Sequence, residues 1–399
     1  MILTEMMNRL EQKESRIIEI RRYLHAHPEL SFEETQTAEY IEEFYKNVNI
    51  DRIETHIGGE NGVVVTIKGK KPGKTIALRA DFDALPIVEE TGLPFASKNP
   101  GVMHACGHDG HTAYMLILAE TLAEMKEELE GTIKIIHQPA EEKSPGGAQG
   151  IIKAGVLNDV DVILGIHVMS TMETGKIYYH AGNTQTGRAD FTLRIQGKGG
   201  HGSSPHLSND AIVAGSSFVM NLQTIVSRRI NPFDTAVVTI GSFDAKGVNN
   251  VIKDTVTLEG NVRFMSNEVK DIVEKEVRRL AKGLDETFGV TTELMYSNDY
   301  PVLYNDPAVT EHVSQVLKQM NIEEVKEVSE TTPQPPSEDF AFYLQEMPGC
   351  FFYVGAMPDN GQFYPHHHPK FDINERSLLI SAKAMAAVVL SYCKFYIKP

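Results

Sequence analysis

The sequence of 399 residues contains no tryptophan and only three cysteines, Cys106, Cys350 and Cys393. An odd and sparse set of cysteines argues against a disulfide framework and favours a reducing compartment. Unbroken apolar runs are also short, because none approaches the roughly 20 residues that a bilayer needs. The first 22 residues mix acidic, basic and apolar side chains, unlike a signal peptide. We therefore expect a cytoplasmic protein without a membrane partner.

Basic side chains are scarce as well: 38 Lys and Arg stand against 54 Asp and Glu, a formal net charge of −16. This charge disfavours phosphate backbones, so nucleic acid is not an expected partner. A hydrophobic content of 41% with 23% charged residues is typical of a globular protein. The length exceeds that of a single typical core, so two domains are expected.

The pattern of apolar residues changes near residue 186. Before it, strand-like runs alternate with helical periodicity, which predicts an α/β layer; the strands are expected at residues 62–67, 74–79, 132–137 and 160–166, with a helix from about 112 to 130. After it, half-buried strands at 191–195, 236–240 and 256–262 accompany helices near 211–225 and 269–288. The sequence therefore predicts an α/β protein in which a discontinuous domain, 1–185 and 298–399, is interrupted by a smaller α+β domain, 186–297.

Four metal-binding side chains gather in residues 104–111, which read HACGHDGH. Thiolate and imidazole are good donors for zinc and other borderline-soft divalent ions. A lone His or Cys is more often a core or surface residue than a ligand. Four together reverse that expectation if other segments supply carboxylate and imidazole partners.

Candidate partners follow the predicted strands, at the sheet edge where α/β proteins gather their functional groups. The potential ligands are Cys106, His108, Glu142, His167 and one of His366, His367 and His368. Five ligands exceed one tetrahedral site, whereas two divalent ions with a shared ligand are a recurrent hydrolytic device. Glu141 then remains as a general base. A solvated acidic turn is the alternative for Glu141 and Glu142, but they directly follow a buried apolar strand.

Nine motifs in order resemble the M20 metallopeptidase family, in its amidohydrolase branch that cleaves N-acyl amino acids, hippurate and auxin conjugates. They span nearly the whole chain: RRYLHAHPELSFEET, ALRADFDALPI, HACGHDGHTA, HQPAEE, GIHV, GKGGHGSSPH, NNVI, SEDFAFY and HHHPKFDINE. The resemblance implies a catalytic domain with two divalent ions per subunit, Zn, Mn, Co or Ni, interrupted by a dimerisation or lid domain.

By position, the family's ligands correspond to Cys106, His108, Glu142, His167 and His367, and its general base to Glu141. His367 is selected because the family's last ligand stands two residues before a proline, here Pro369. His104 and His111 are expected to support the site or cap the helix, and Asp81 and Asp109 to orient ligands. Asp339 is expected either to orient a ligand or to cap a loop.

The resemblance also assigns residues in the insert. His201, with His206 as a rival, Asn250 and Arg263 correspond to residues of the family that polarise the scissile carbonyl and hold the substrate carboxylate, with His201 expected to be catalytic and Asn250 and Arg263 to bind the substrate. A guanidinium grips a carboxylate through two parallel hydrogen bonds, although Arg263 on an edge strand facing solvent is the alternative. Family dimers pair through this domain, so a homodimer or a higher homo-oligomer is expected, with His201 reaching the partner's site.

These observations predict a metal-dependent amidohydrolase acting on N-acyl-L-amino acids or similar small amides with a free carboxylate. A dipeptidase or aminoacylase of the same fold is the nearest alternative. A binding protein that keeps the fold without catalysis is a more distant one, because the presence of Glu141 speaks against it.

Overall fold

The computed structural model describes residues 2–59, 61–320 and 322–394 and divides into two compact units. Unit 1 comprises Met1–Gly182, Tyr304–Thr332 and Asp339–Pro399, and unit 2 comprises Asn183–Leu303 and Pro333–Glu338. The strands β7 (Gly182–Gln185) and β14 (Leu303–Asn305) lie where the chain passes between the units. The predicted α/β class is confirmed.

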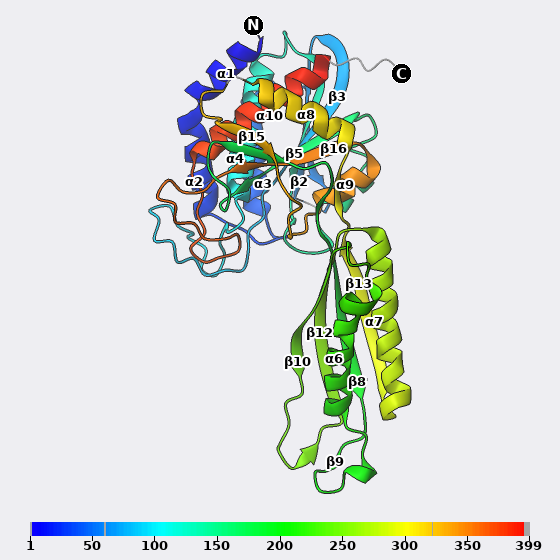
Figure 1. Cartoon of the computed structure of the whole chain (residues 1–399). Coiled ribbons are helices and arrows are strands. Elements are labelled where there is room, and N and C mark those ends of the chain that lie inside the picture. The colour runs from blue at the N-terminus through cyan, green and yellow to red at the C-terminus, as the bar shows by residue number, and fades with distance from the viewer. Residues whose placement is uncertain (1, 60, 321, 395–399) are drawn as a thin grey trace. The chain divides into compact units, whose positions relative to one another are not determined.

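Unit 1 is built on a mixed sheet of eight strands in the order β1-β2-β4-β3-β5-β16-β6-β15 (Figure 1). The strands are β1 (Arg52–Ile57), β2 (Gly62–Lys68), β3 (Lys71–Asp81), β4 (Glu130–Gln138), β5 (Val162–Met169), β6 (Lys176–Tyr179), β15 (Glu327–Glu330) and β16 (Gly349–Gly355). The central strands β4, β3, β5 and β16 run parallel to one another. Every residue of β5 and β16 is buried, as expected for parallel strands covered on both faces.

Helices cover this sheet. They are α1 (Ile2–Gln12), α2 (Glu14–Ala26), α3 (Thr35–Tyr45), α4 (His108–Glu124), α5 (Ala148–Lys153), α8 (Pro307–Gln319), α9 (Phe340–Glu346) and α10 (Arg376–Lys394). The helices α4 and α10 contact each other and β3, and α1 and α2 pack onto α4. By length and composition α10 could span a bilayer, but 89% of residues Arg376–Cys393 are buried, as in a core helix. Lys383 and the serines of α10 interrupt its apolar residues, so the sequence shows no long unbroken apolar run here.

Helix α4 starts earlier than the sequence predicted, at His108 rather than near Thr112. Two glycines that read as turn residues explain the difference. Gly107 precedes the helix with φ 92°, in the left-handed region that favours glycine. Gly110 lies inside the first turn, where a Cβ atom would stand 2.8 Å from Leu378 Cδ2. The second glycine therefore permits close packing against α10 and does not break α4.

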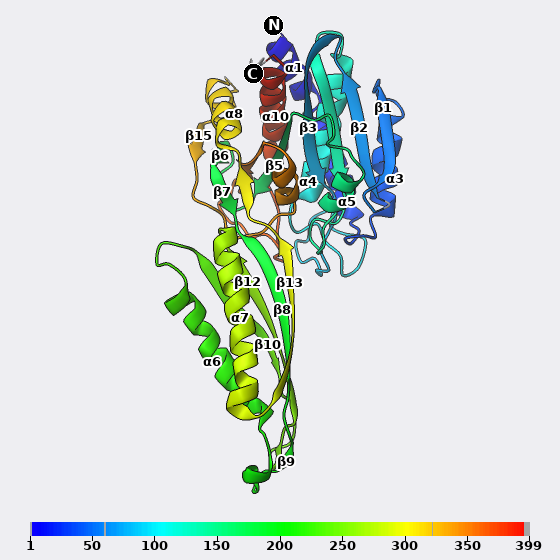
Figure 2. The ribbon, with the colours of Figure 1, turned by 90° about the vertical axis from the view of Figure 1, so that its right-hand side faces the viewer.

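Unit 2 contains an antiparallel sheet in the order β10-β12-β8-β13. Its strands are β8 (Gly187–Gln196), β10 (Ala236–Asp244), β12 (Thr255–Phe264) and β13 (Thr291–Tyr300), and its helices are α6 (Ala211–Arg229) and α7 (Asn267–Phe288). Figure 2 shows both helices on one face of this sheet, and buried and more exposed residues alternate along β8 and β12. A two-stranded ribbon, β9 (Gly200–His201) with β11 (Val251–Ile252), and the short 3₁₀ helix η1 (Pro205–Leu207) complete the unit.

The segment Pro333–Glu338 belongs to unit 2, although the sequence patterns gave no reason to separate it from the C-terminal part of the chain. The Thr186 hydroxyl donates to the Pro335 carbonyl at 2.6 Å, and Gln185 forms a β-bridge with Gln334. These contacts hold the segment beside the start of β8.

Candidate metal centre

The candidate centre lies in unit 1, where three neighbouring parallel strands end. Strand β3 ends at Asp81, β4 leads into Glu141 and Glu142, and β5 carries His167. Because β4, β3 and β5 are adjacent and parallel, these segments meet at one edge of the sheet. The start of α4 delivers His108 to the same edge.

Two overlapping groups of side chains could each hold an ion. The first is Cys106, His108 and His167, the second is Cys106, Glu142 and His367, and within each group the ligand atoms lie within 4.8 Å of one another. His108 Nε2 stands 3.8 Å from Glu142 Oε1, and both atoms are buried without a hydrogen-bond partner in the part of the chain that the structure describes. Unpaired buried polar atoms are costly unless something binds them. This donor set fits two divalent ions that share Cys106.

Hydrogen bonds aim the histidines of the first group. His108 Nδ1 lies 3.1 Å from both Asp83 Oδ1 and the Asp83 carbonyl, so it carries the proton and leaves Nε2 as the donor atom for a metal. His167 Nδ1 donates to the Val168 carbonyl at 2.8 Å, and its Nε2 faces Cys106 Sγ at 3.6 Å. In the neutral form of each ring, Nε2 is therefore the unprotonated nitrogen.

In contrast, the atoms of His111 and Asp81 that could bind a metal already form hydrogen bonds. The Val168 backbone N–H donates to His111 Nε2 at 3.0 Å, so the proton of this ring sits on Nδ1 and is donated to Asp81 Oδ1 at 2.6 Å. Arg79 Nη1 donates to the other oxygen of Asp81 at 2.5 Å. These contacts support the expectation that both residues orient the site.

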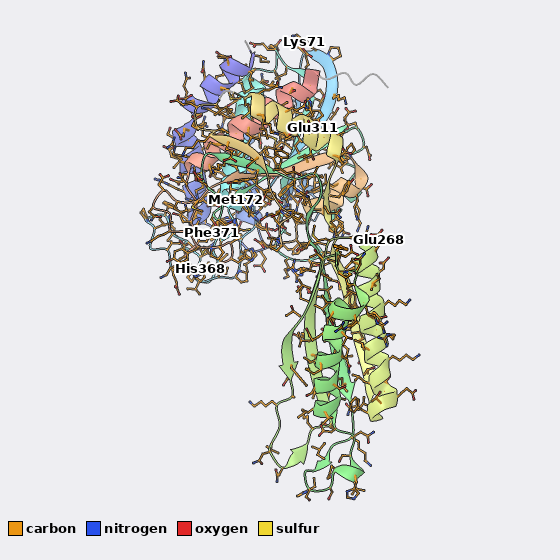
Figure 3. The ribbon with its side chains drawn as sticks, viewed as in Figure 1. Lys71, Met172, Glu268, Glu311, His368 and Phe371 are labelled. Carbon is orange, nitrogen blue, oxygen red and sulfur yellow. The ribbon has the colours of Figure 1, made fainter. Side chains whose placement is uncertain are left out.

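The three adjacent histidines have different surroundings. The Ser170 N–H donates to His366 Nε2 at 3.3 Å, and Nδ1 of the same ring lies 3.6 Å from Cys106 Sγ. The Lys370 N–H donates to His368 Nδ1 at 3.0 Å. His367, with a left-handed φ of 66°, points Nε2 to within 3.2 Å of Glu142 Oε1. Figure 3 labels His368 and Phe371 in this loop. Among the described residues, His367 is the ring of the three that falls in a candidate metal-binding group, with Cys106 and Glu142, which supports its selection as a ligand.

The ionisable side chains at the centre shift one another's pKa values. Burial and the carboxylates of Glu142 and Glu141 raise the pKa of the Cys106 thiol well above its ordinary value. Burial alone would lower the pKa of His108, but Asp81 and Asp83 raise it to about 10. Burial, with His111 nearby, holds the pKa of His167 well below its ordinary value. A cation would relieve the repulsion among the carboxylates and stabilise the thiolate.

Three supporting residues gave weak sequence signals. Asp83 orients His108 and also accepts the Glu142 N–H at 2.9 Å; its only signal was its position two residues after Asp81. Arg21 is fully buried and donates to Asp109 Oδ2 at 3.0 Å, and it could have been found as the charged residue on the apolar face of α2 with Ile17 and Leu24. Asp339, in turn, does not cap a helix.

Asp339 instead joins a buried network. It accepts hydrogen bonds from Arg79 Nη2 at 2.8 Å, from Gln138 Nε2 at 2.8 Å and from the Ala148 N–H at 3.1 Å. Because Arg79 also holds Asp81, Asp339 acts indirectly on the residues that orient the centre. His104, also buried, makes no side-chain hydrogen bond within the described residues, and burial lowers its pKa to about 4.

Unit 2 brings two of its predicted site residues together. His201 in β9 pairs with Val251, and Gly202 N–H donates to the Asn250 carbonyl at 2.8 Å, so His201 and Asn250 are close neighbours. The Ser203 N–H donates to His201 Nδ1 at 3.2 Å, which places the ring proton on Nε2 when the histidine is neutral. His201 and Asn250 are exposed.

Arg263 lies elsewhere in this unit. It is next to last in β12, eight residues beyond Thr255, which corresponds to about 27 Å of strand. Its Nε donates to Asn261 Oδ1 at 3.0 Å and its Nη1 to Ser337 Oγ at 2.8 Å, and the side chain is half-buried, so it does not simply face solvent. Within one chain, Arg263 is thus too distant from His201 for both to contact one small molecule.

Residues 77–391 match the sequence model of peptidase family M20/M25/M40. An N-acyl-L-amino acid amidohydrolase of Geobacillus stearothermophilus is 40% identical over 309 residues, covering 77% of this chain and 83% of its own. A crystal structure from methicillin-resistant Staphylococcus aureus is 61% identical with a TM-score of 0.92, covering 98% of this chain and 100% of its own. The Bacillus subtilis YXEP protein, described as a dinuclear metal-binding peptidase of family M20, is 34% identical with a TM-score of 0.82, covering 96% and 99%.

Proposed function

The chain belongs to peptidase family M20/M25/M40 and is a hydrolase of C–N bonds, and from this premise we propose that it cleaves the amide bond of N-acyl-L-amino acids or similar small amides with a free carboxylate. The observation that carries the proposal is the pair of groups sharing Cys106, in which His108 Nε2 and His367 Nε2 lie 3.8 Å and 3.2 Å from the buried Glu142 Oε1. Hydrolysis of a peptide by the same centre is the alternative.

In this proposal Cys106, His108, Glu142, His167 and His367 hold two divalent ions. When bound, such ions supply positive charge that acidifies a water molecule and stabilises a developing oxyanion. Glu141 accepts the proton of the attacking water and returns it to the leaving amine. This role is supported by the position of Glu141, which is 6% exposed and lies with Oε2 4.0 Å from His108 Nε2.

We assign the polarisation of the scissile carbonyl to His201, with Asn250 beside it, and the binding of the substrate carboxylate to Arg263. The hydrogen bond from Ser203 favours this role, because it leaves a proton on His201 Nε2 that can be donated to a carbonyl oxygen. The length of β12 between Arg263 and the His201 ribbon is more than one small substrate can span. We therefore propose that the protein is a cytoplasmic homodimer. In this dimer, the His201 and the Arg263 that serve one site come from different chains.

Two matched substitutions test the centre. Glu141→Gln should keep both ions and lower kcat by about 10²–10⁴, the usual contribution of a general base. Glu142→Gln should lose metal as well, because it removes a ligand. Metal content by elemental analysis and hydrolysis rates on a panel of N-acetyl amino acids and dipeptides give the two readouts. Equal metal loss in both variants, or activity in a rigorously metal-free preparation, would contradict the proposal.

A further inference from the structure

The turn that carries Glu141 is held by two buried carboxylates. On one side of Glu141, the Ala140 N–H donates to Glu34 Oε1 at 2.8 Å. On the other side, the Glu142 N–H donates to Asp83 Oδ2 at 2.9 Å. The Pro139–Ala140 and Glu141–Glu142 peptide groups are thus both held by acceptors from distant parts of the chain.

Ala140 needs such support. It is fully buried with φ 56°, in the left-handed region where a residue with a Cβ atom is strained. Backbone of this kind persists when the surrounding structure holds it, and it clusters at functional sites. Besides the bond from its N–H to Glu34, Ala140 accepts the Gly147 N–H on its carbonyl at 3.1 Å.

Glu34, which accepts the Ala140 N–H, lies in a position that is energetically unfavourable for a carboxylate. It occupies the N-cap position of α3, yet its side chain makes no capping hydrogen bond and is fully buried. Its second oxygen accepts the Asn61 amide at 3.0 Å, and no cation forms an ion pair with it among the described residues. Burial and the nearby Asp83 raise the pKa of Glu34 to about 7. Burying a carboxyl group without a cationic partner lowers the stability of the fold. Stability alone therefore does not explain why Glu34 is buried at this position.

We propose that Glu34 is a positioning residue for the hydrolysis: by accepting the Ala140 N–H, it fixes the strained backbone before Glu141 and aims the Glu141 carboxylate. This inference rests on the proposed function, in which Glu141 is the general base. Misplacing a reacting group by about 1 Å can lower the rate by about two orders of magnitude. Loss of a hydrogen bond one residue from Glu141 can therefore lower the rate of hydrolysis substantially.

Two conservative variants separate the hydrogen bond from the charge. Glu34→Gln loses the charge but keeps a carbonyl oxygen that can accept the Ala140 N–H, while the Asn61 amide turns to accept the new NH₂ group. Glu34→Asp keeps the charge but is one methylene shorter and cannot reach. We expect Glu34→Asp to lower kcat by about 10–100-fold, the usual effect of losing a supporting hydrogen bond, with KM and both ions retained. Glu34→Gln should remain close to the wild type.

Adding Ala140→Gly to Glu34→Asp should restore part of kcat, because glycine adopts the left-handed conformation without strain. Glu29→Asp is the matched control: it shortens in the same way a carboxylate that accepts the Thr37 N–H at 2.8 Å in the first turn of α3, and Glu29 makes no side-chain hydrogen bond to the turn at Glu141 among the described residues. It should leave kcat unchanged.

The inference is overturned if Glu34→Asp keeps the wild-type kcat, if Glu34→Gln loses as much as Glu34→Asp, or if Glu34→Asp loses metal in proportion to rate. A loss of kcat in Glu29→Asp equal to that in Glu34→Asp would also overturn it, by showing that disturbing α3 suffices. Glu141→Gln separates this failure from that of the proposed function. If Glu141→Gln is inactive while Glu34→Asp is active, only the positioning role falls, whereas an active Glu141→Gln removes the function on which it rests.

Discussion

Filling the metal centre should release protons, because two of its ligands are protonated in the metal-free protein at pH 7. The pKa of Cys106 lies well above its ordinary value and that of His108 is raised to about 10. His167 has a lowered pKa and is already neutral. Since the metal binds thiolate and neutral imidazole, it must displace one proton from Cys106 and one from His108.

The size of the effect follows from linkage. Both pKa values in the metal-free protein lie above neutral pH, and both bound forms are deprotonated, so metal affinity rises with pH and levels off only above those pKa values. Each displaced proton is worth about 1.4 kcal/mol per pH unit. With two protons, the combined affinity for the two ions should rise about 100-fold per pH unit between roughly pH 7 and 9, which follows from the same constant.

Calorimetric titration of the metal-free protein with Zn²⁺, in two buffers of equal pH and different ionisation enthalpy, counts the protons. A bound water can add one more, so the decisive quantity is a difference between variants. Cys106→Ser should release about one proton fewer than the wild type, because a serine hydroxyl stays protonated. Cys350→Ala removes a buried thiol outside the centre and should change nothing. Equal proton counts for the wild type and Cys106→Ser would refute the reasoning.

Two further predictions concern positioning and assembly. The two carboxylate oxygens of Asp83 accept three hydrogen bonds, and Asp83→Asn replaces one of these oxygens with an NH₂ group that can only donate. This change should weaken metal binding about 10–100-fold in a chelator competition, whereas Asp306→Asn, at a helix cap, should bind normally; an unchanged affinity in Asp83→Asn would contradict this. Mixing inactive Glu141→Gln and His201→Ala under subunit exchange should restore about a quarter of wild-type activity in a two-fold dimer. No recovery after exchange verified by mass would exclude a cross-subunit role for His201.

Local sequence patterns predicted most elements because those elements are apolar runs with a clear period. The residues of β5 and β16 are buried throughout, and their continuous apolar sequences mark them without knowledge of their neighbours. Candidate ligands could be predicted because thiol, imidazole and carboxylate groups stood directly after such runs. The start of α4 was misplaced because glycine normally signals a turn, while Gly110 serves the approach of α10, a tertiary contact.

Residues that act through long-range hydrogen bonds left no such pattern. Glu34 reads as one of several acids at the start of α3, and only the fold brings it to Ala140, 106 residues away. Arg21 reads as part of an amphipathic helix, and its partner Asp109 lies 88 residues away. A sequence window cannot contain both members of either pair, so their roles emerge only when the packing of unit 1 is known.

The histidines at 366–368 also show what the sequence alone cannot predict, in this case which ring nitrogen faces the candidate centre. All three have the same chemistry, so composition and spacing alone cannot choose between them. Backbone N–H groups can only donate, and those of Ser170 and Lys370 therefore occupy a lone pair on His366 and on His368 respectively. His367 Nε2 faces Glu142 instead. His366 also approaches the centre, with Nδ1 3.6 Å from Cys106 Sγ, so the proposal of His367 as the ligand rests on its grouping with Cys106 and Glu142. The left-handed φ of His367 is the backbone feature that accompanies the direction of its ring.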